Sequence, residues 1–308
     1  MSKILVTGSN GLIGSAIRSI ASNCEDDFYF VTRKDADLTS RDEVHLLFDR
    51  IQPDLVIHAA AKVGGLGANL SQPADFFYQN IIMNSHMIHY AMLFGVKKML
   101  CFSSLCTFPH DAKILREDLQ QVGEPYIGNY AYGYAKRMVD IQIRAYKEQY
   151  KTEYCSMILT NTYGPYDNWN LDDGHVVPSL IHKCHLAKQE GKPLVLWGDG
   201  STLREFIYAG DVARCAMDII KSNNIVDKVI ISSQEELTIK KLCEYVCSAL
   251  EFDGEILYDR TKSNGQHKRP SDNTVLRNLV PDFKFTSTKD GVKIAADWFV
   301  DHYPNVRK

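Results

Sequence analysis

Short apolar runs alternate with longer stretches of helical periodicity through the first two-thirds of the chain. The runs that predict buried strands lie at residues 4–7, 28–31, 55–58, 98–102 and 154–159. The stretches that predict helices lie at residues 12–21, 41–50, 74–94 and 130–150. Because strands and helices alternate, the pattern favours an α/β fold with a doubly wound parallel sheet.

The pattern changes after residue 165, where a loop rich in Asn, Asp and Gly begins and the alternation becomes irregular. Further helices are predicted near residues 177–190, 210–221, 238–250 and 289–302. We therefore expect a first domain made of residues 1–165 plus about 207–232. A smaller, discontinuous α/β domain is expected at about 166–206 and 233–308.

Composition narrows the class of protein. The 308 residues are 45% hydrophobic and 24% charged, as in ordinary globular proteins. A net charge of −3 gives no electrostatic reason to expect nucleic acid or an anionic membrane as a partner. No apolar stretch could span a bilayer, and the first strand begins too early to leave room for a signal peptide. The eight cysteines lack metal-ligand spacing, so we expect no metal site and a reducing, cytoplasmic location.

A glycine-rich turn, GSNGLIG, joins the first predicted strand to the first predicted helix. This is the context that a dinucleotide-binding motif requires, although glycines at such a turn also occur for turn geometry alone. In a Rossmann-type fold the glycines admit the cofactor pyrophosphate to the helix N-terminus. The residues expected to contact a dinucleotide here are Gly8, Ser9, Asn10, Gly11, Leu12, Ile13 and Gly14.

The end of the second predicted strand bears on the choice of cofactor. An NAD site places a carboxylate there, whereas an NADP site places a cation for the 2′-phosphate. Arg33 and Lys34 occupy this position, which favours NADP, although two adjacent cations can also be plain solvated charge. Asp37 follows closely and could face the adenine or cap the next helix.

Tyr132 and Lys136 lie four residues apart on a predicted helix and therefore share one face. A neighbouring ammonium favours ionised tyrosine and should lower a phenol pKa that is otherwise about 10. The pair could then exchange protons with a carbonyl or alcohol. An ordinary amphipathic helix shows the same spacing, so the neighbouring motifs decide between these readings.

Those motifs resemble the extended short-chain dehydrogenases/reductases, and within them the GDP-L-fucose synthase family. The resemblance covers residues 3 to about 210 and becomes loose after about 235. The segments that carry it are His58–Ala61, Ala61–Gly65, Pro73–Asn80, Ser103–Ser104, Cys106–Pro109, Tyr132–Lys136, Thr160–Pro165, His175–Pro178 and Trp197–Phe206.

This family epimerises and reduces GDP-4-keto-6-deoxymannose with NADPH, as a precursor for surface polysaccharides. The resemblance implies that Tyr132 donates a proton, Lys136 tunes it and holds the nicotinamide ribose, and Ser104 binds the carbonyl oxygen. Ser103 is a competing candidate. Cys106 and His175 match the acid/base pair for epimerisation at carbons 3 and 5. An isolated Cys or His at these places would be a buried hydrophobe or a surface residue.

The resemblance further implies cofactor contacts by Ala60, Asn161 and His175, and substrate contacts by Lys183, Trp197, Arg204 and Asn264. It also implies a homodimer through the helices at 74–94 and 130–150. The chain departs from the family at three places, with Lys183 for an arginine, Asn264 for an aspartate, and Asn10 where an arginine can assist the 2′-phosphate. These departures also fit a related sugar, including a heptose.

The sequence leaves three other hypotheses about the function open. The protein could reduce carbon 4 without epimerising its substrate. It could be a nucleotide-sugar 4-epimerase or dehydratase that retains NAD, although Arg33 and the Cys106/His175 pair argue against this. It could also sense a dinucleotide without chemistry, which the intact Ser104, Tyr132 and Lys136 disfavour.

Overall fold

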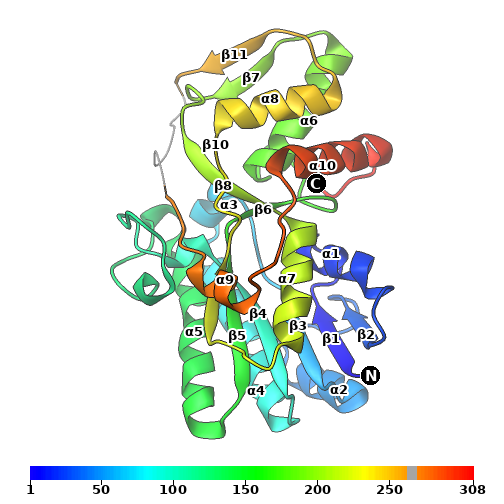
Figure 1. The fold of residues 1–308 in the computed structure, drawn as a ribbon, viewed down its shortest axis with the longest axis vertical. Helices are drawn as coiled ribbons and strands as arrows, with labels where there is room; N and C mark the ends of the chain where they lie inside the picture. The colour runs from blue at the N-terminus through cyan, green and yellow to red at the C-terminus, as the bar shows by residue number, and fades with distance from the viewer. Residues whose placement is uncertain (262–268) are drawn as a thin grey trace.

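The protein is described by a computed structural model that covers residues 1–261 and 269–308. Its centre is a six-stranded sheet in the order β2-β1-β3-β4-β5-β9, and every neighbouring pair is parallel (Figure 1). The strands are β1 (Lys3–Thr7), β2 (Asp27–Val31), β3 (Leu55–His58), β4 (Lys98–Ser104), β5 (Glu153–Leu159) and β9 (Lys228–Ile231). The predicted doubly wound α/β fold is confirmed.

Helices cover both faces of this sheet. On one face lie α1 (Leu12–Ala21), α7 (Ala209–Lys221) and α9 (Thr274–Leu279), and on the other lie α2 (Arg41–Ile51), α4 (Pro73–Leu93) and α5 (Tyr130–Tyr150). Along β1, Ile4 and Val6 enter one core while Leu5 enters the other, because successive strand side chains point to opposite faces. Because the large sheet is buried on both faces, the sequences of its strands are continuous apolar runs.

A second, smaller part of the molecule lies beyond the carboxyl ends of the sheet strands (Figure 1). It contains a three-stranded sheet, β10-β8-β6, and a parallel pair, β11-β7. These strands are β6 (Asn161–Tyr163), β7 (Leu194–Trp197), β8 (Leu203–Tyr208), β10 (Glu236–Thr238) and β11 (Ile256–Asp259). The helices that enclose its core are α6 (Val176–Glu190), α8 (Ile239–Leu250) and α10 (Thr288–His302).

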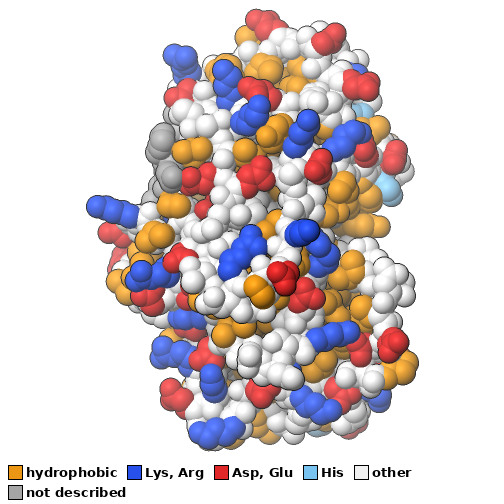
Figure 2. Space-filling model, in the orientation of Figure 1, with side chains coloured by type: hydrophobic (Ala, Val, Ile, Leu, Met, Phe, Trp, Pro, Cys, Tyr) orange, Lys and Arg blue, Asp and Glu red, His pale blue; other side chains and the backbone are white. Residues whose placement is uncertain are grey.

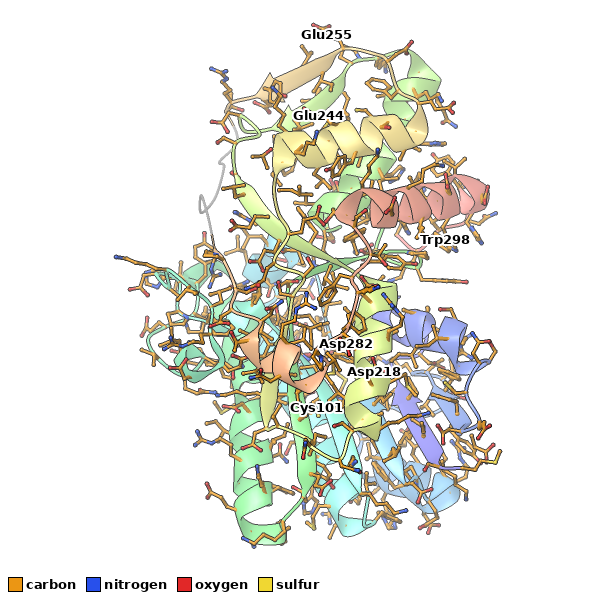
Figure 3. All side chains as sticks on the ribbon, viewed as in Figure 1. Cys101, Asp218, Glu244, Glu255, Asp282 and Trp298 are labelled. Atoms are coloured by element: carbon orange, nitrogen blue, oxygen red, sulfur yellow. The ribbon has the colours of Figure 1, made fainter. Side chains whose placement is uncertain are left out.

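Short elements account for what the hydrophobic pattern missed. The eight helices that the periodicity predicts all occur, each within one residue of its predicted ends. Strands β6 to β11 and the six-residue helices α3 (Leu66–Ser71) and α9 were not predicted. Each of these strands except β8 has only three or four residues, which are too few positions to show a period of two. Among the residues labelled in Figure 3, Cys101 lies in the large sheet and Trp298 on α10 of the second part.

The part of the chain that is described shows a face of mixed charge and cysteines that form no disulfide. Basic and acidic side chains are interspersed over the face shown in Figure 2. All eight cysteines are free thiols. Within residues 1–261 and 269–308, no helix is long and apolar enough to cross a bilayer, and no cluster of His, Cys, Asp or Glu is arranged to hold a metal ion.

Candidate active site

A cavity of about 1570 Å³ lies between the carboxyl ends of the large sheet and the second part of the molecule. It brings together residues from Gly8 to Arg307, which are almost 300 positions apart in the chain. The predicted site residues that line it are Gly8, Ser9, Asn10, Gly11, Leu12, Ile13, Arg33, Ala60, Ser104, Cys106, Tyr132, Asn161, His175, Lys183, Trp197 and Arg204. Gly14 and Lys136 lie behind the wall of the cavity, and Asn264 lies outside the described residues.

The glycine turn closes tightly against the end of β3. Gly8 has a φ of +66°, and a β-carbon there would lie 2.6 Å from the amide nitrogen of Ala60. A β-carbon on Gly14 would lie 2.4 Å from the carbonyl oxygen of Gly8, so both positions require glycine. Gly11 is the N-cap of α1 and provides no side chain to the first-turn N–H groups. Those groups can therefore bind a phosphate, at the place where the strand order reverses between β1 and β3.

Hydrogen bonds beneath the turn fix the ends of β1 and β3. The Ala60 N–H donates to Thr7 Oγ1 (3.4 Å), and the Thr7 hydroxyl lies 2.7 Å from His58 Nδ1. His58 Nε2 lies 3.0 Å from Asn84 Oδ1, which accepts its proton. Burial lowers the pKa of His58 to about 3, so the imidazole is neutral and can accept from Thr7. This series of hydrogen bonds has a structural role, because it fixes the strand ends beneath the glycine turn.

Cationic and anionic side chains follow β2 in the cavity wall. Arg33 is 84% exposed and its Nη2 lies 3.9 Å from Asp37 Oδ2. The Asp37 carboxylate accepts from the backbone N–H and the hydroxyl of Thr39 (3.0 and 2.8 Å), just before the N-cap Ser40 of α2. Asp37 therefore shapes the turn that precedes the helix, and the Arg33 guanidinium remains at the surface of the cavity.

Lys136 is buried and Tyr132 is partly buried, and this burial overturns one expectation. The pKa of Tyr132 is raised, first by burial and then by the neighbouring Cys106, while its hydrogen bond with Ser104 acts in the opposite direction. The sequence predicted that Lys136 lowers the pKa of Tyr132, and that prediction is wrong. Lys136 Nζ donates to the carbonyl oxygen of Phe102 (2.9 Å), and burial lowers the Lys136 pKa to about 8. The ammonium thus faces the end of β4.

Ser104 and Ser103 lie in different surroundings at the end of β4. Ser104 Oγ accepts from the backbone N–H of Cys106 (3.2 Å) and bonds to Tyr132. Ser103 Oγ is buried without a hydrogen-bond partner among the described residues. Ser104 is therefore the serine that the structure couples to the phenol.

Cys106 lies on a 3₁₀ turn, Leu105–Thr107, directly after β4. Its sulfur accepts a hydrogen bond from Asn129 Nδ2 (3.0 Å), and Asn129 immediately precedes α5. The thiol is partly exposed and lines the same cavity as Tyr132. The Asn129 amide therefore fixes the position of the sulfur at the cavity wall.

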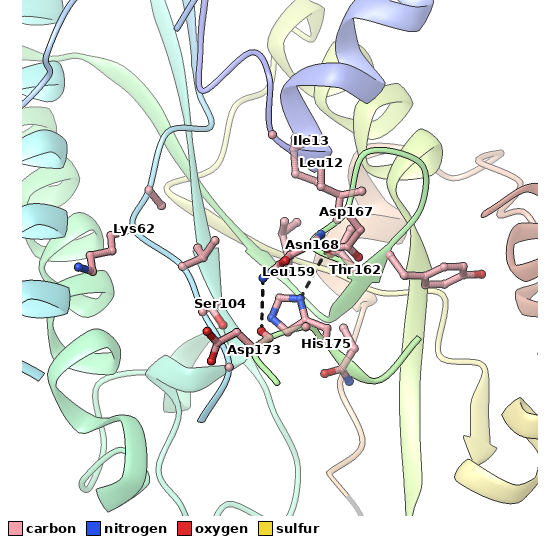
Figure 4. Close-up of a pocket in the computed structure, with 18 of the residues that line it drawn as sticks. Leu12, Ile13, Lys62, Ser104, Leu159, Thr162, Asp167, Asn168, Asp173 and His175 are labelled. Carbon is pink, nitrogen blue, oxygen red and sulfur yellow. Dashed lines mark hydrogen bonds and ion pairs between the residues drawn. The ribbon is translucent and has the colours of Figure 1, made fainter. Parts of the chain in front are cut away.

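His175 is the N-cap of α6, with its side chain 56% exposed within the cavity. Figure 4 shows its ring directed toward Asp167, and His175 Nδ1 lies 3.9 Å from Asp167 Oδ1. The buried Asp167 carboxylate raises the pKa of His175, against burial and the positive charge of Arg307. His175 consequently holds a proton to higher pH than a free imidazole.

Replacing Asp167 by Asn should lower the pKa of His175, because the charge that stabilises the imidazolium is lost. An NMR titration of the His175 ring protons measures this change. Since the folded-state pKa lies above the unfolded value of about 6.5, the pair stabilises the fold fully below that pH, and the stabilisation is lost as pH rises through the folded pKa. The stability advantage of wild type over Asp167→Asn should shrink across that window. Asp173→Asn, at the same cavity, is the matched control, and an unchanged His175 pKa in Asp167→Asn would contradict the pairing.

The far end of the cavity is basic and aromatic. Lys183 Nζ lies 4.3 Å from the ring centroid of Trp197, which is 58% exposed and therefore is not core packing. Arg204, on β8, is half-buried, and its pKa is lowered first by burial and then by the nearby charge of Arg269. Arg269 Nη2 donates to Pro109 O (3.1 Å), while its buried Nε–H has no partner among the described residues. Two guanidinium groups therefore meet in one wall.

Glu205 links the two chain segments that carry these arginines. Its buried carboxylate accepts from the Ser232 hydroxyl (2.7 Å) and from the backbone N–H of Ser271 (2.8 Å) and also bonds the Ser271 hydroxyl. Glu205 follows Arg204 and Ser271 lies two residues after Arg269, so this carboxylate joins the two segments that carry the cations.

Comparison with known proteins assigns the family. Residues 4–231 match the family model "NAD dependent epimerase/dehydratase family". A GDP-L-fucose synthase from Dictyostelium discoideum is 37% identical, over 99% of this chain and 97% of its own. The chain belongs to the GDP-L-fucose synthase family.

Solved structures agree with this family assignment. The crystal structure of a GDP-L-fucose synthetase from Naegleria fowleri bound to NADP has a TM-score of 0.95 and 34% identity, covering 100% of this chain and 95% of that one. A GDP-mannoheptose C4 reductase from Campylobacter jejuni with NADP bound has a TM-score of 0.85 and 29% identity, covering 97% and 98%. The second similarity concerns a heptose enzyme, so family membership alone does not select the sugar.

Three residues of this family member escaped the sequence analysis, namely Asn129, Asp167 and Arg269. Each acts on a residue that was singled out, respectively Cys106, His175 and Arg204. Asn129 and Asp167 are single polar residues in loops, which carry no local signal. Arg269 lies 160 residues from its partner Pro109, so only the folded chain reveals it.

Proposed function

We propose that this protein uses NADPH to reduce carbon 4 of a GDP-linked 4-keto sugar, a 6-deoxyhexose or a heptose, and that Cys106 and His175 epimerise carbons 3 and 5. The observation that carries the proposal is that one cavity contains all the groups that this chemistry needs. A phosphate-binding turn, a serine–tyrosine pair and two arginines all line its wall. The sheet domain, residues 1–165 plus about 207–232, holds the cofactor, and residues at about 166–206 and 233–308 hold the nucleotide sugar.

Residues of the first domain fit NADP(H). The N-terminal turn of α1 binds the pyrophosphate, Ala60 and Asn161 border the same side of the cavity, and Arg33 binds the 2′-phosphate. Lys136 holds the nicotinamide ribose, and its pKa of about 8 leaves it mainly charged at neutral pH. NADPH supplies the hydride that reaches carbon 4.

Arg33→Ala should weaken NADPH binding about 10-fold, because one charge-assisted contact with the 2′-phosphate is removed at an exposed site. The affinity for NADH should not change, since NADH lacks that phosphate. Dissociation constants from quenching of the protein's tryptophan fluorescence measure both. Equal weakening of the two cofactors would show that Arg33 does not select NADP.

Tyr132 completes the reduction by donating its phenolic proton to the oxygen at carbon 4, while Ser104 donates a hydrogen bond to the same oxygen. The raised pKa of Tyr132 suits this direction, because burial keeps the phenol protonated until negative charge develops beside it. The positive charge of Lys136, four residues along α5, then stabilises the tyrosinate. A proton from solvent restores the phenol.

Epimerisation uses the acidity of the protons next to the carbon 4 ketone. One of the pair Cys106 and His175 removes a proton to form an enolate, and the other delivers a proton to the opposite face. Asn129 donates a hydrogen bond to the Cys106 sulfur, and Asp167 favours a protonated His175. The pair can then act with Cys106 as the base and His175 as the acid.

The GDP portion binds at the basic end of the cavity. Arg204 and Arg269 present planar donors to the diphosphate, which supplies a partner for the buried Nε–H of Arg269. Trp197 offers an exposed ring on which a guanine can stack. Lys183 Nζ lies over the same ring. Asn264 is proposed to contact the substrate as well, from the residues that the structure does not describe.

One assay tests the whole proposal. The protein is offered GDP-4-keto-6-deoxymannose, or the corresponding heptose, with NADPH in deuterated water. Oxidation of NADPH reports the reduction, and deuterium at carbons 3 and 5 reports epimerisation. Turnover without stoichiometric NADPH consumption would instead identify an NAD-retaining 4-epimerase or dehydratase. No reaction with either sugar would refute the proposal.

The protein is proposed to act as a homodimer in the cytoplasm. A shallow groove between α4 and α5 is lined by Ile81, Met138 and Ile141, of which Met138 and Ile141 are more than a third exposed. Packing of this face on a second copy would bury it. Eight free thiols fit a reducing compartment.

Ile141→Asp should shift the protein from dimer to monomer, because a charge in a buried apolar interface is costly. Light scattering after size-exclusion chromatography measures the mass. Leu46→Asp places the same charge at an exposed leucine of α2, away from the groove, and should leave the mass unchanged. A monomeric wild-type protein would refute the dimer.

A further inference from the structure

The segment that follows α10 returns to the cavity and brings a cation to it. Tyr303 and Val306 pack on the core of the second part, and the backbone carbonyl of Arg307 accepts from the N–H of Trp169 (2.9 Å). Lys308 Nζ lies 5.3 Å from the ring centroid of Tyr303. Of residues 303–308, all of which the structure describes, Arg307 alone lines the cavity.

The Arg307 guanidinium lies beside the glycine turn. Its Nη1 is 4.0 Å from the place where a β-carbon of Gly11 would lie, at the N-terminus of α1. Residues 8–14 themselves include no charged side chain. The turn thus provides backbone N–H groups for a phosphate, while its nearby positive side chain comes from the opposite end of the sequence.

The surroundings of Arg307 leave its charge available. Among the described residues it forms no ion pair with a carboxylate within 4.0 Å. Its charge acts on His175, whose pKa it lowers against the larger effect of Asp167. A planar guanidinium that lines a cavity beside helix N-terminal N–H groups can donate paired hydrogen bonds to the doubly charged pyrophosphate.

We propose that Arg307 binds the pyrophosphate of the dinucleotide together with the N-terminal turn of α1, an inference that rests on the proposed use of NADP(H). Arg33 lies after β2 and serves the 2′-phosphate, and Arg204 and Arg269 lie in the wall assigned to the diphosphate of the sugar nucleotide. Only Arg307, of these four, lies against Gly11. Because its backbone is held by Trp169, the residue also links the second part of the molecule to the cofactor bound on the sheet.

Equilibrium binding separates the three phosphate groups that Arg307 could contact. Arg307→Gln removes the charge and shortens the side chain, but it keeps a polar N–H donor. It should raise the dissociation constants of NADPH and NADH by the same factor, about 10- to 100-fold, and leave that of GDP unchanged. Arg307→Lys should give a smaller loss, since a charge remains without the bidentate geometry. Lys308→Ala, which removes the neighbouring cation, is the matched control and should bind as wild type does.

Other results would overturn the inference in distinct ways. Weaker binding of NADPH alone would place Arg307 at the 2′-phosphate, and weaker binding of GDP alone would place it at the sugar nucleotide. Unchanged binding of all three ligands would remove it from the site. If Arg307→Gln does not fold, judged by its thermal unfolding, Arg307→Lys against Lys308→Ala decides the question. A wild-type protein that binds neither dinucleotide would refute the proposed function itself.

Discussion

Tyr132→Phe should lower kcat for NADPH-dependent reduction by about 10²- to 10⁴-fold, the range that a positioned general acid contributes. The phenylalanine keeps the ring, whose edge packs on Phe76 at a centroid distance of 6.2 Å, and removes only the hydroxyl that bonds to Ser104. The dissociation constant of NADPH should therefore change little. Single-turnover reduction, followed by NADPH absorbance, measures the loss.

The matched control for this change is Tyr130→Phe. Tyr130 begins the same helix but is 45% exposed and lies outside the cavity wall, so its variant should reduce substrate at the wild-type rate. Reduction by Tyr132→Phe at a rate near that of wild type would show that another group, or water, protonates the oxygen at carbon 4.

Cys106→Ser should lower the rate at which solvent deuterium enters the sugar next to the ketone by about 10²- to 10⁴-fold. The reason is that a serine hydroxyl is a far weaker base than a thiolate. Reduction of a substrate whose carbons 3 and 5 are already epimerised should persist. Mass spectrometry of the product, formed in deuterated water, measures the incorporation.

A variant of Asn129 provides a second test of the role of Cys106. Asn129→Leu removes the donor to the Cys106 sulfur and should slow deuterium entry less than Cys106→Ser does, with reduction again preserved. Equal loss of reduction and deuterium entry in Cys106→Ser would mean that Cys106 shapes the whole cavity. Full deuterium entry in Cys106→Ser would assign the base role elsewhere.

Local sequence patterns were sufficient for the main elements. The run at β1 followed by GSNGLIG predicts a strand, a tight turn and a helix, because each depends on neighbours within a few residues. The parallel order of the sheet followed from the alternation of such units. The strands of the second part are only three to six residues long, and their pairing depends on segments far away, as between β7 and β11.

Tyr132 and Lys136 on α5 show what sequence spacing can predict and what only the packed structure determines. Spacing correctly places Tyr132 and Lys136 on one helix, but it does not determine their pKa values. Burial dominates both groups, raising the pKa of the phenol and lowering that of the ammonium, and burial is a property of the packed molecule.

The sequence by itself thus determined five of the six strands of the large sheet, the long helices, the family and a set of site residues most of which line the cavity. Periodicity, turn chemistry and motifs are properties of contiguous residues, so they can be recognised in the sequence. The tertiary structure decided which groups act on one another. Asp167 beside His175, Arg269 beside Arg204 and Arg307 beside Gly11 are brought together by folding alone. Electrostatic and hydrogen-bonding effects depend on distance in space and on exclusion of water, and neither can be read from separation along the chain.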